Sequence, residues 1–78
     1  MDPLIRKYTF SSFEEAITFI DCTAIIFSRE NHHPKITNFY NLVEFEYYTT
    51  SANNKVTELD YKIAKEVEKI YRKLTPQS

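Results

Sequence analysis

The chain of 78 residues contains no glycine, and this absence limits where its backbone can turn. About five glycines would be expected at the usual frequency of roughly 7%. Tight turns often need a residue with positive φ, and asparagine tolerates that conformation better than most other residues. We therefore expect Ser51–Lys55 to be a polar loop whose positive-φ positions are the adjacent Asn53 and Asn54.

The length allows a single domain over residues 1–78. A domain near this size buries only about 60–65% of the surface that its unfolded chain exposes, so its own core provides little stability. The single cysteine, Cys22, cannot form a disulfide within the chain, and no Cys/His set has zinc-ligand spacing. Self-association remains as a source of stability. We expect a homo-oligomer that pairs through the Val43–Thr49 strand or the Leu4–Phe10 strand, with Tyr61 or Ile63 against the partner.

The composition argues against several classes of protein. Ten basic and eleven acidic residues give a net charge of −1, which does not favour direct binding of nucleic acid. No apolar run approaches the ~20 residues of a membrane span, and the first ten residues carry charges in place of a signal-peptide core. We expect a cytoplasmic protein that acts on neither membranes nor nucleic acid.

The first half of the chain predicts a strand followed by a helix. Residues Leu4–Phe10 alternate in the period of two that is typical of a strand. Ser11 and Ser12 each precede a glutamate by three residues, the spacing of a capping box, which predicts a helix from Phe13 to near Asn31. An apolar stripe along this helix is expected to face the sheet: Phe13, Ile17, Ile20, Ala24 and Phe27.

The second half predicts two strands and a second helix. Ile36–Tyr40 and Val43–Thr49 are the strands, with a tight turn at Asn41; Val43, Phe45, Tyr47 and Thr49 share one side of the second strand. Thr57 and Asp60 have capping-box spacing at the start of a helix that Pro76 ends. Its apolar side contains Ile63, Ala64, Val67, Ile70, Tyr71 and Leu74. The order β-α-β-β-α predicts an α+β two-layer sandwich, an antiparallel sheet with both helices on one face.

The only two histidines, His32 and His33, stand side by side where the first helix gives way to an extended segment fixed by Pro34. Their side chains must diverge, so the two rings cannot readily bind one metal ion. An unperturbed imidazole titrates near pH 6.5, which favours a role in proton transfer. The alternative is a pair of surface histidines placed where the helix C-terminus favours positive charge.

The run Glu30-Asn31-His32-His33-Pro34, followed by Asn38-Phe39-Tyr40-Asn41, resembles the signature of the pterin-4a-carbinolamine dehydratases. The resemblance covers nearly the whole chain and extends through Leu4-x-Arg6-x-Tyr8-x-Phe10, Phe13-Glu14-Glu15-Ala16 and Val56-Thr57-x-x-Asp60 with Ala64. Members of this family are lyases that remove water from 4a-hydroxytetrahydropterin to give quinonoid dihydropterin, as part of tetrahydrobiopterin recycling. The resemblance implies a pterin substrate, no metal, no cofactor, and a homodimer or homotetramer.

The resemblance also implies roles for single residues. His32 is the general acid or base, His33 positions the pterin, and Asp60 helps to orient the site. Loss of water needs an acid for the departing hydroxyl and a base for a ring N–H, each within hydrogen-bond reach. Asp60 could equally be only the capping partner of Thr57. Substrate contacts are implied at Asn31, Pro34, Tyr40 and Thr50.

Three departures from the family pattern leave a second function open. The third histidine of the family falls on Thr50, and a threonine does not exchange protons at neutral pH. Ser28 and Ile36 stand where a charged and an aromatic residue are usual, and the N-terminal helix and first strand of most relatives have no counterpart, so we expect a sheet of three strands. The alternative is a non-catalytic interaction module, a dimerisation cofactor or assembly chaperone. The change at Thr50 favours this alternative, whereas the retained Asn-His-His-Pro run favours the enzyme.

Overall fold

The computed structural model describes residues 2–75, so the helix stop predicted at Pro76 lies outside the described residues. Its elements are β1 (Leu4–Thr9), α1 (Phe13–Glu30), β2 (Lys35–Phe39), β3 (Leu42–Tyr47), the short 3-10 helix η1 (Thr50–Ala52) and α2 (Glu58–Leu74). Strand ends agree with the predicted ones to within two residues. The predicted β-α-β-β-α order is confirmed, and η1 is an addition that the sequence pattern does not indicate.

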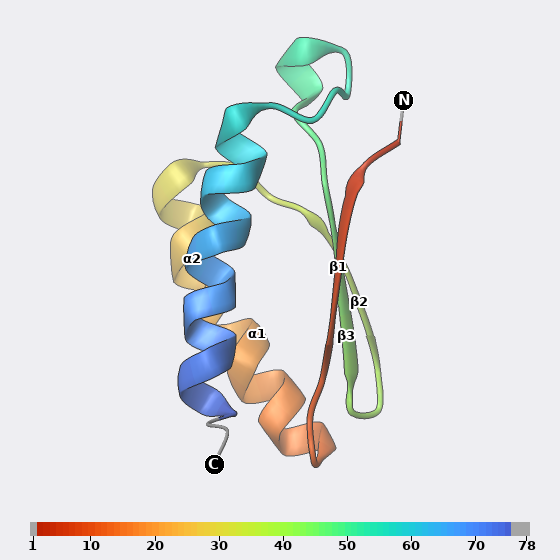
Figure 1. Ribbon diagram of the computed structural model, residues 1–78, viewed down its shortest axis with the longest axis vertical. Helices are drawn as coiled ribbons and strands as arrows, with labels where there is room; N and C mark the ends of the chain where they lie inside the picture. Colours follow the sequence, from red (N-terminus) through yellow and green to blue (C-terminus); the bar gives the residue numbers. More distant parts are fainter. Residues whose placement is uncertain (1, 76–78) are drawn as a thin grey trace.

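The sheet is antiparallel with the strand order β1-β3-β2. Both helices cover the same face of this sheet (Figure 1), which confirms the two-layer sandwich. Because β3 lies in the centre, its backbone is hydrogen-bonded on both sides. The expectation that Val43–Thr49 pairs with a second chain is therefore wrong. Only β1 and β2 have a free edge within this three-stranded sheet.

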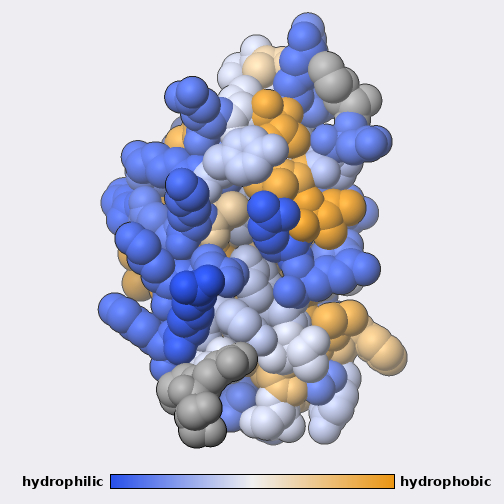
Figure 2. Space-filling model, in the orientation of Figure 1, coloured by the Kyte–Doolittle hydropathy of each residue, from blue (hydrophilic) through white to orange (hydrophobic). Residues whose placement is uncertain are grey.

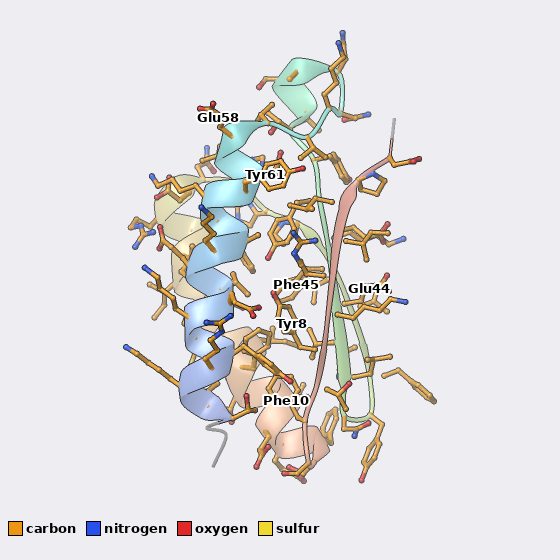
Figure 3. All side chains as sticks on the ribbon, in the orientation of Figure 1. Tyr8, Phe10, Glu44, Phe45, Glu58 and Tyr61 are labelled. Atoms are coloured by element: carbon orange, nitrogen blue, oxygen red, sulfur yellow. The ribbon has the colours of Figure 1, made fainter. Side chains whose placement is uncertain are left out.

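The core between sheet and helices is built mainly from aromatic rings. Figure 3 shows Tyr8, Phe10 and Phe45 directed from the strand layer toward the helices. Phe19 of α1 is fully buried, with its ring centroid 4.9 Å from Tyr8, 5.0 Å from Phe10 and 5.7 Å from Phe45. Tyr71 of α2 completes the cluster at 5.9 Å from Phe19. One ring of α1 thus contacts the sheet and the second helix together.

Helix α1 starts as predicted but buries a different stripe. The Ser12 hydroxyl accepts a hydrogen bond from the Glu15 N–H at 3.1 Å, which confirms the N-cap. The buried residues are Ala16, Phe19, Thr23, Ile26 and Phe27. Of the predicted stripe, Phe13 is 44% exposed and Ala24 is also exposed, so the expectation fails for these two residues. The helix has apolar residues on more than one side, and packing of Phe19 among the rings of the sheet decides which side is buried.

Helix α2 buries the predicted face except at Leu74, which is 37% exposed. Ile63, Ala64 and Val67 are buried, and Ile70 and Tyr71 pack partly buried against the core. Since Ile63 has no exposed surface, it is not free to contact a partner, whereas Tyr61 is 51% exposed. Figure 2 shows hydrophilic side chains along the α2 side of the molecule, with apolar patches toward the sheet. Within residues 2–75, no helix has the length and apolar character needed to cross a membrane.

Asparagine supplies most of the positive-φ positions among the described residues: Asn31 (49°), Asn53 (57°) and Asn54 (61°). The expected turn at the Asn53-Asn54 pair is confirmed. The fourth position is Tyr40 (53°), which precedes Asn41 in the two-residue turn between β2 and β3. The Asn38 side-chain amide donates to the Tyr40 carbonyl at 3.1 Å, so a nearby hydrogen bond supports this uncommon conformation.

Replacing Phe19 tests the importance of the aromatic cluster. Phe19→Ala is expected to lower the free energy of unfolding by about 3–5 kcal/mol, because it removes a fully buried ring and leaves a cavity. Ile25→Ala is the control, since Ile25 lies on the same helix and is 71% exposed, and its effect should stay within about 0.5 kcal/mol. Urea unfolding of both variants measures the difference. Equal effects would contradict the assignment of Phe19 as the centre of the core.

Candidate active site

The end of α1 sets the direction of the histidine pair. Asn31 adopts the left-handed conformation at the helix C-cap, with φ 49° and ψ 46°. The His32 backbone N–H donates to the Phe27 carbonyl at 3.0 Å, and the Asn31 N–H donates to Ser28 at 3.2 Å. Such bonds satisfy carbonyl groups that the helix leaves free. Asn31 therefore has a structural role, because it turns the chain so that His32 lies toward α2.

His32 is bonded to the buried carboxylate at the start of α2. Its Nε2 atom lies 2.6 Å from Oδ1 of Asp60, although the two residues are 28 positions apart. The Asp60 side chain has no exposed surface, and 11% of the His32 side chain is exposed. The sequence resemblance implied an orienting role for Asp60. The structure brings together the two residues that such a role requires.

The second oxygen of Asp60 is held by two threonines. Oδ2 accepts a hydrogen bond from the Thr49 hydroxyl at 2.8 Å and one from the Thr57 backbone N–H at 2.9 Å. The Thr49 and Thr57 hydroxyl oxygens lie 2.8 Å apart. The bond from the Thr57 N–H is the carboxylate half of the predicted capping box. Asp60 is therefore a helix cap and a partner of His32 at the same time, so the two predicted roles are compatible.

These hydrogen bonds determine the charge of Asp60. Burial opposes its ionisation, but the bonds from His32, from the Thr57 N–H and from Thr49 outweigh that effect and hold the pKa of Asp60 below its ordinary value. An ionised carboxylate can only accept hydrogen bonds, so the Nε2 atom of His32 carries a proton. The arrangement can hold an imidazole in one orientation for proton transfer. Within residues 2–75, no group of three or more His, Cys, Asp or Glu residues is placed to hold a metal ion.

The sequence patterns did not single out Thr49, although they contained a signal for it. Thr49 continues the alternation of Val43, Phe45 and Tyr47, whose side chains are buried against the helices. The same inward direction brings the Thr49 hydroxyl to Asp60. A polar residue that continues a buried alternation needs a hydrogen-bond partner, and this need could have identified it.

The predicted substrate-binding residues do not all gather at His32. His33 is exposed whereas His32 is mostly buried, so the two side chains diverge as expected. Pro34 is buried just before β2. Tyr40 lies in the turn at the other end of β2, about 16 Å along a strand of five residues, and is 62% exposed. Within one chain, the length of β2 thus separates Tyr40 from His32 and Asp60.

Thr50 lies at the surface and directly follows Thr49, the residue whose hydroxyl contacts Asp60. It is exposed at the start of η1, whereas the preceding Thr49 faces inward. With Pro3, Tyr48 and Asn54 it lines a hollow of about 430 Å³. Tyr48 and Thr50 therefore line the same hollow. The contact with Asp60, and through it with His32, comes from Thr49.

Ion pairs join the two helices beside this site. Arg29 near the end of α1 binds Glu66 of α2 at 2.6 Å, and Lys62 of α2 lies 3.6 Å from Glu30. Exposed pairs of this kind usually contribute about 0.2–1 kcal/mol each. They nevertheless connect the same two helices as the His32–Asp60 hydrogen bond. The position of His32 relative to α2 is therefore fixed by several independent contacts.

Comparisons with known proteins identify the family. A family model described as "Pterin 4 alpha carbinolamine dehydratase" matches residues 1–70. A protein of Chelativorans sp. (strain BNC1) is 40% identical over 62 residues, covering 80% of this chain and 62% of that protein. One from Opitutus terrae is 39% identical over 69 residues, with 88% and 71% covered. Both are named "Putative pterin-4-alpha-carbinolamine dehydratase".

A solved structure agrees with the sequence matches. A protein of Brucella melitensis, described as a "transcriptional coactivator/pterin dehydratase", superposes with a TM-score of 0.83 and 34% sequence identity. The match covers 90% of this chain and 73% of the other one. The chain belongs to the pterin-4a-carbinolamine dehydratase family. It spans about six to seven tenths of the length of these relatives.

The charge of Asp60 predicts how stability depends on pH. Its folded-state pKa lies below the unfolded value of about 3.9, so its contribution is complete above about pH 4 and is lost as the pH falls through the folded-state pKa. Asp60→Asn should lower the free energy of unfolding at pH 7 by about 1–3 kcal/mol and flatten its decrease in acid.

Urea unfolding between pH 2 and pH 7 measures both effects. Glu66→Gln is the control, because Arg29 also lowers the pKa of Glu66 but this carboxylate is partly exposed. Its effect at pH 7 should stay below about 1 kcal/mol. Wild-type and Asp60→Asn curves that run parallel throughout would show that folding does not shift the pKa of Asp60.

Proposed function

We propose that this protein dehydrates 4a-hydroxytetrahydropterin to quinonoid dihydropterin, with His32 as general acid and base. The observation that supports this most strongly is the 2.6 Å hydrogen bond between His32 and the buried Asp60, in a chain of the dehydratase family. A buried carboxylate that orients an imidazole is a common arrangement in acid–base catalysis.

The reaction needs only proton transfers at the protein. The bond between C4a and the hydroxyl oxygen breaks as an acid protonates the leaving hydroxyl, and a base removes a proton from a ring nitrogen. One proton is given and one is taken, so water leaves and no electrons are exchanged with the protein. An imidazole can give a proton in its charged form and take one in its neutral form. His32 therefore alternates between its two protonation states, while the exposed His33 contacts the pterin.

The hollow beside Thr50 is proposed as a contact surface for the part of the pterin that lies away from His32, because His32 and Asp60 are not among its lining residues. Its volume of about 430 Å³ falls within the range of about 300–1,000 Å³ usual for small-molecule sites. Tyr48 offers a flat face for stacking, and Asn54 offers an amide for hydrogen bonds. Thr49, which contacts Asp60, lies between Tyr48 and Thr50 in the sequence, but its side chain faces the helices. Asn31, Pro34, Tyr40 and Thr50 remain predicted substrate contacts, of which Thr50 lines this hollow.

A second candidate function is that of a protein-interaction module. The Brucella protein described as a "transcriptional coactivator/pterin dehydratase" suggests it, and Thr50 in place of a histidine favours it. Ile25 is 71% and Phe39 is 78% exposed, which leaves apolar surface for a partner.

We also propose a cytoplasmic homodimer or homotetramer that uses the free edge of β1 or β2. Catalysis and assembly are compatible in one protein.

Replacing His32 tests the catalytic proposal. His32→Gln keeps a side-chain N–H for Asp60 but cannot exchange protons near pH 7, so dehydration should fall by about 10²–10⁴-fold while the fold is retained. His32→Ala would be less informative, because it also removes a hydrogen-bond donor from the buried Asp60 carboxylate and so changes stability as well as catalysis. His33→Gln is the matched control, and it should mainly raise KM.

Activity and binding need separate measurements. Dehydration is followed by the disappearance of the 4a-hydroxy adduct, and binding by tyrosine fluorescence, because the chain has no tryptophan. A loss smaller than threefold in His32→Gln would reject His32 as the proton carrier. Binding of pterin without turnover in the wild type would favour the interaction module.

Thr50→His tests whether the missing histidine limits the rate. A histidine at this exposed position should increase dehydration severalfold, because it adds an imidazole that titrates near neutral pH at the edge of the hollow. Thr50→Gln is the control for a larger side chain that does not titrate, and it should not increase the rate. A slower reaction in Thr50→His would indicate that another group, such as Tyr48, already has this role.

A further inference from the structure

We propose that Thr49 is the positioning residue for His32 and that His32 exchanges protons through Nδ1. This inference rests on the proposed function, because it specifies how the same site would carry a proton. The structure contributes a set of hydrogen bonds in which Thr57 donates to Thr49, and Thr49 and His32 both donate to Asp60.

The first step is the direction of each hydrogen bond. The Thr49 hydroxyl has one proton, and an ionised Asp60 can only accept, so Thr49 donates to Oδ2 at 2.8 Å. The Thr57 hydroxyl, 2.8 Å from the Thr49 oxygen, then donates to Thr49. Its direct distance to Asp60 Oδ2 is 3.5 Å, too long for a strong bond. The short hydroxyl bond to the carboxylate therefore comes from Thr49.

The second step is the part of the fold to which Thr49 belongs. Thr57 precedes α2 and holds Asp60 from its own helix, whereas Thr49 follows β3. Oδ2 is thus fixed from two different elements, and because a carboxylate is planar, fixing Oδ2 also fixes Oδ1. Oδ1 in turn accepts from Nε2 of His32. Without the Thr49 hydroxyl, Oδ2 would be held mainly by the Thr57 N–H at the start of α2.

The third step identifies the nitrogen that reacts. With a proton held on Nε2 by Asp60, the neutral ring has its free lone pair on Nδ1. Among residues 2–75, Nδ1 of His32 has no hydrogen-bond partner. It is therefore the only ring nitrogen free to accept a substrate proton and to return one. Asp60 would stabilise the imidazolium that forms in between.

The Thr49 hydroxyl can be removed without disturbing the backbone of this segment. The Thr49 backbone N–H donates to the Lys55 carbonyl at 2.9 Å and forms an isolated β-bridge with that residue. This bridge holds the chain at residue 49 whatever the side chain is. Valine has nearly the shape of threonine, so Thr49→Val removes the donor and little else.

The experiment compares Thr49→Val with Thr37→Val, the same substitution at an exposed threonine of β2 that has no part in the site. Thr49→Val should lower kcat by about tenfold or more, the usual consequence of losing a hydrogen bond to a charged group at a site, and Thr37→Val by less than about threefold. Thr49→Ser restores the hydroxyl and should recover most of the rate. Thr49→Ala is a second variant without the hydroxyl, should the valine fold poorly.

Two readouts do not depend on turnover. The ¹⁵N shifts of the His32 ring should show a proton on Nε2 in the wild type and in Thr49→Ser, and a mixture of tautomers in Thr49→Val. The ¹³C shift of the Asp60 carboxyl should report a higher pKa in Thr49→Val, because the carboxylate has lost a donor. His33 in the same spectra is the internal reference.

The outcomes separate this proposal from the proposed function. A wild-type His32 tautomer together with an unchanged Asp60 pKa in Thr49→Val would overturn the positioning role, whatever the activity. A proton on Nδ1 of neutral His32 in the wild type would overturn the assignment of the reacting atom. A wild type that shows the expected spectra but no dehydration would count against the proposed function and leave the positioning role supported.

Discussion

A carboxylate with no exposed surface must be surrounded by donors, and the structure around Asp60 follows from that requirement. Its donors come from the end of α1, from the segment after β3 and from the residue before α2. A buried charge left without such donors would be strongly unfavourable. The three segments are thus held together at one end of the sandwich because each donates a hydrogen bond to the same carboxylate.

The lack of glycine shapes the same region. Three of the four positive-φ positions among residues 2–75 are asparagines, and two of these flank the site. Asn31 ends α1 immediately before His32, and Asn53 follows the segment that contains Thr49. Asparagine accepts the left-handed conformation at lower cost than most residues, although it restricts the backbone more than glycine does. The two turns that present His32 and Thr49 are therefore made by residues with a narrower choice of conformation.

Sequence reasoning succeeded where a local pattern had one physical solution. The capping residues Ser12 and Thr57 predicted the helix starts, and the paired asparagines predicted the turn. It failed where the pattern allowed more than one buried face. Helix α1 has apolar residues on more than one side, and only the packing of Phe19 against the sheet decides which side is buried. The strand order also lay beyond local patterns, because the central place of β3 depends on which strands meet after folding. For the site, the resemblance indicated His32 and Asp60, but Thr49 required the three-dimensional contact.

The separation of His32 and Asp60 along the chain has a consequence for how the site arises. These residues lie 28 positions apart, and the hairpin of β2 and β3 lies between them. Loop closure opposes contacts this distant in sequence, so they cost more entropy than local ones. The imidazole therefore acquires its fixed orientation only when α2 docks and brings Asp60 to it. A nascent or partly unfolded chain would contain both residues but no site, so the site itself reports whether the domain has folded.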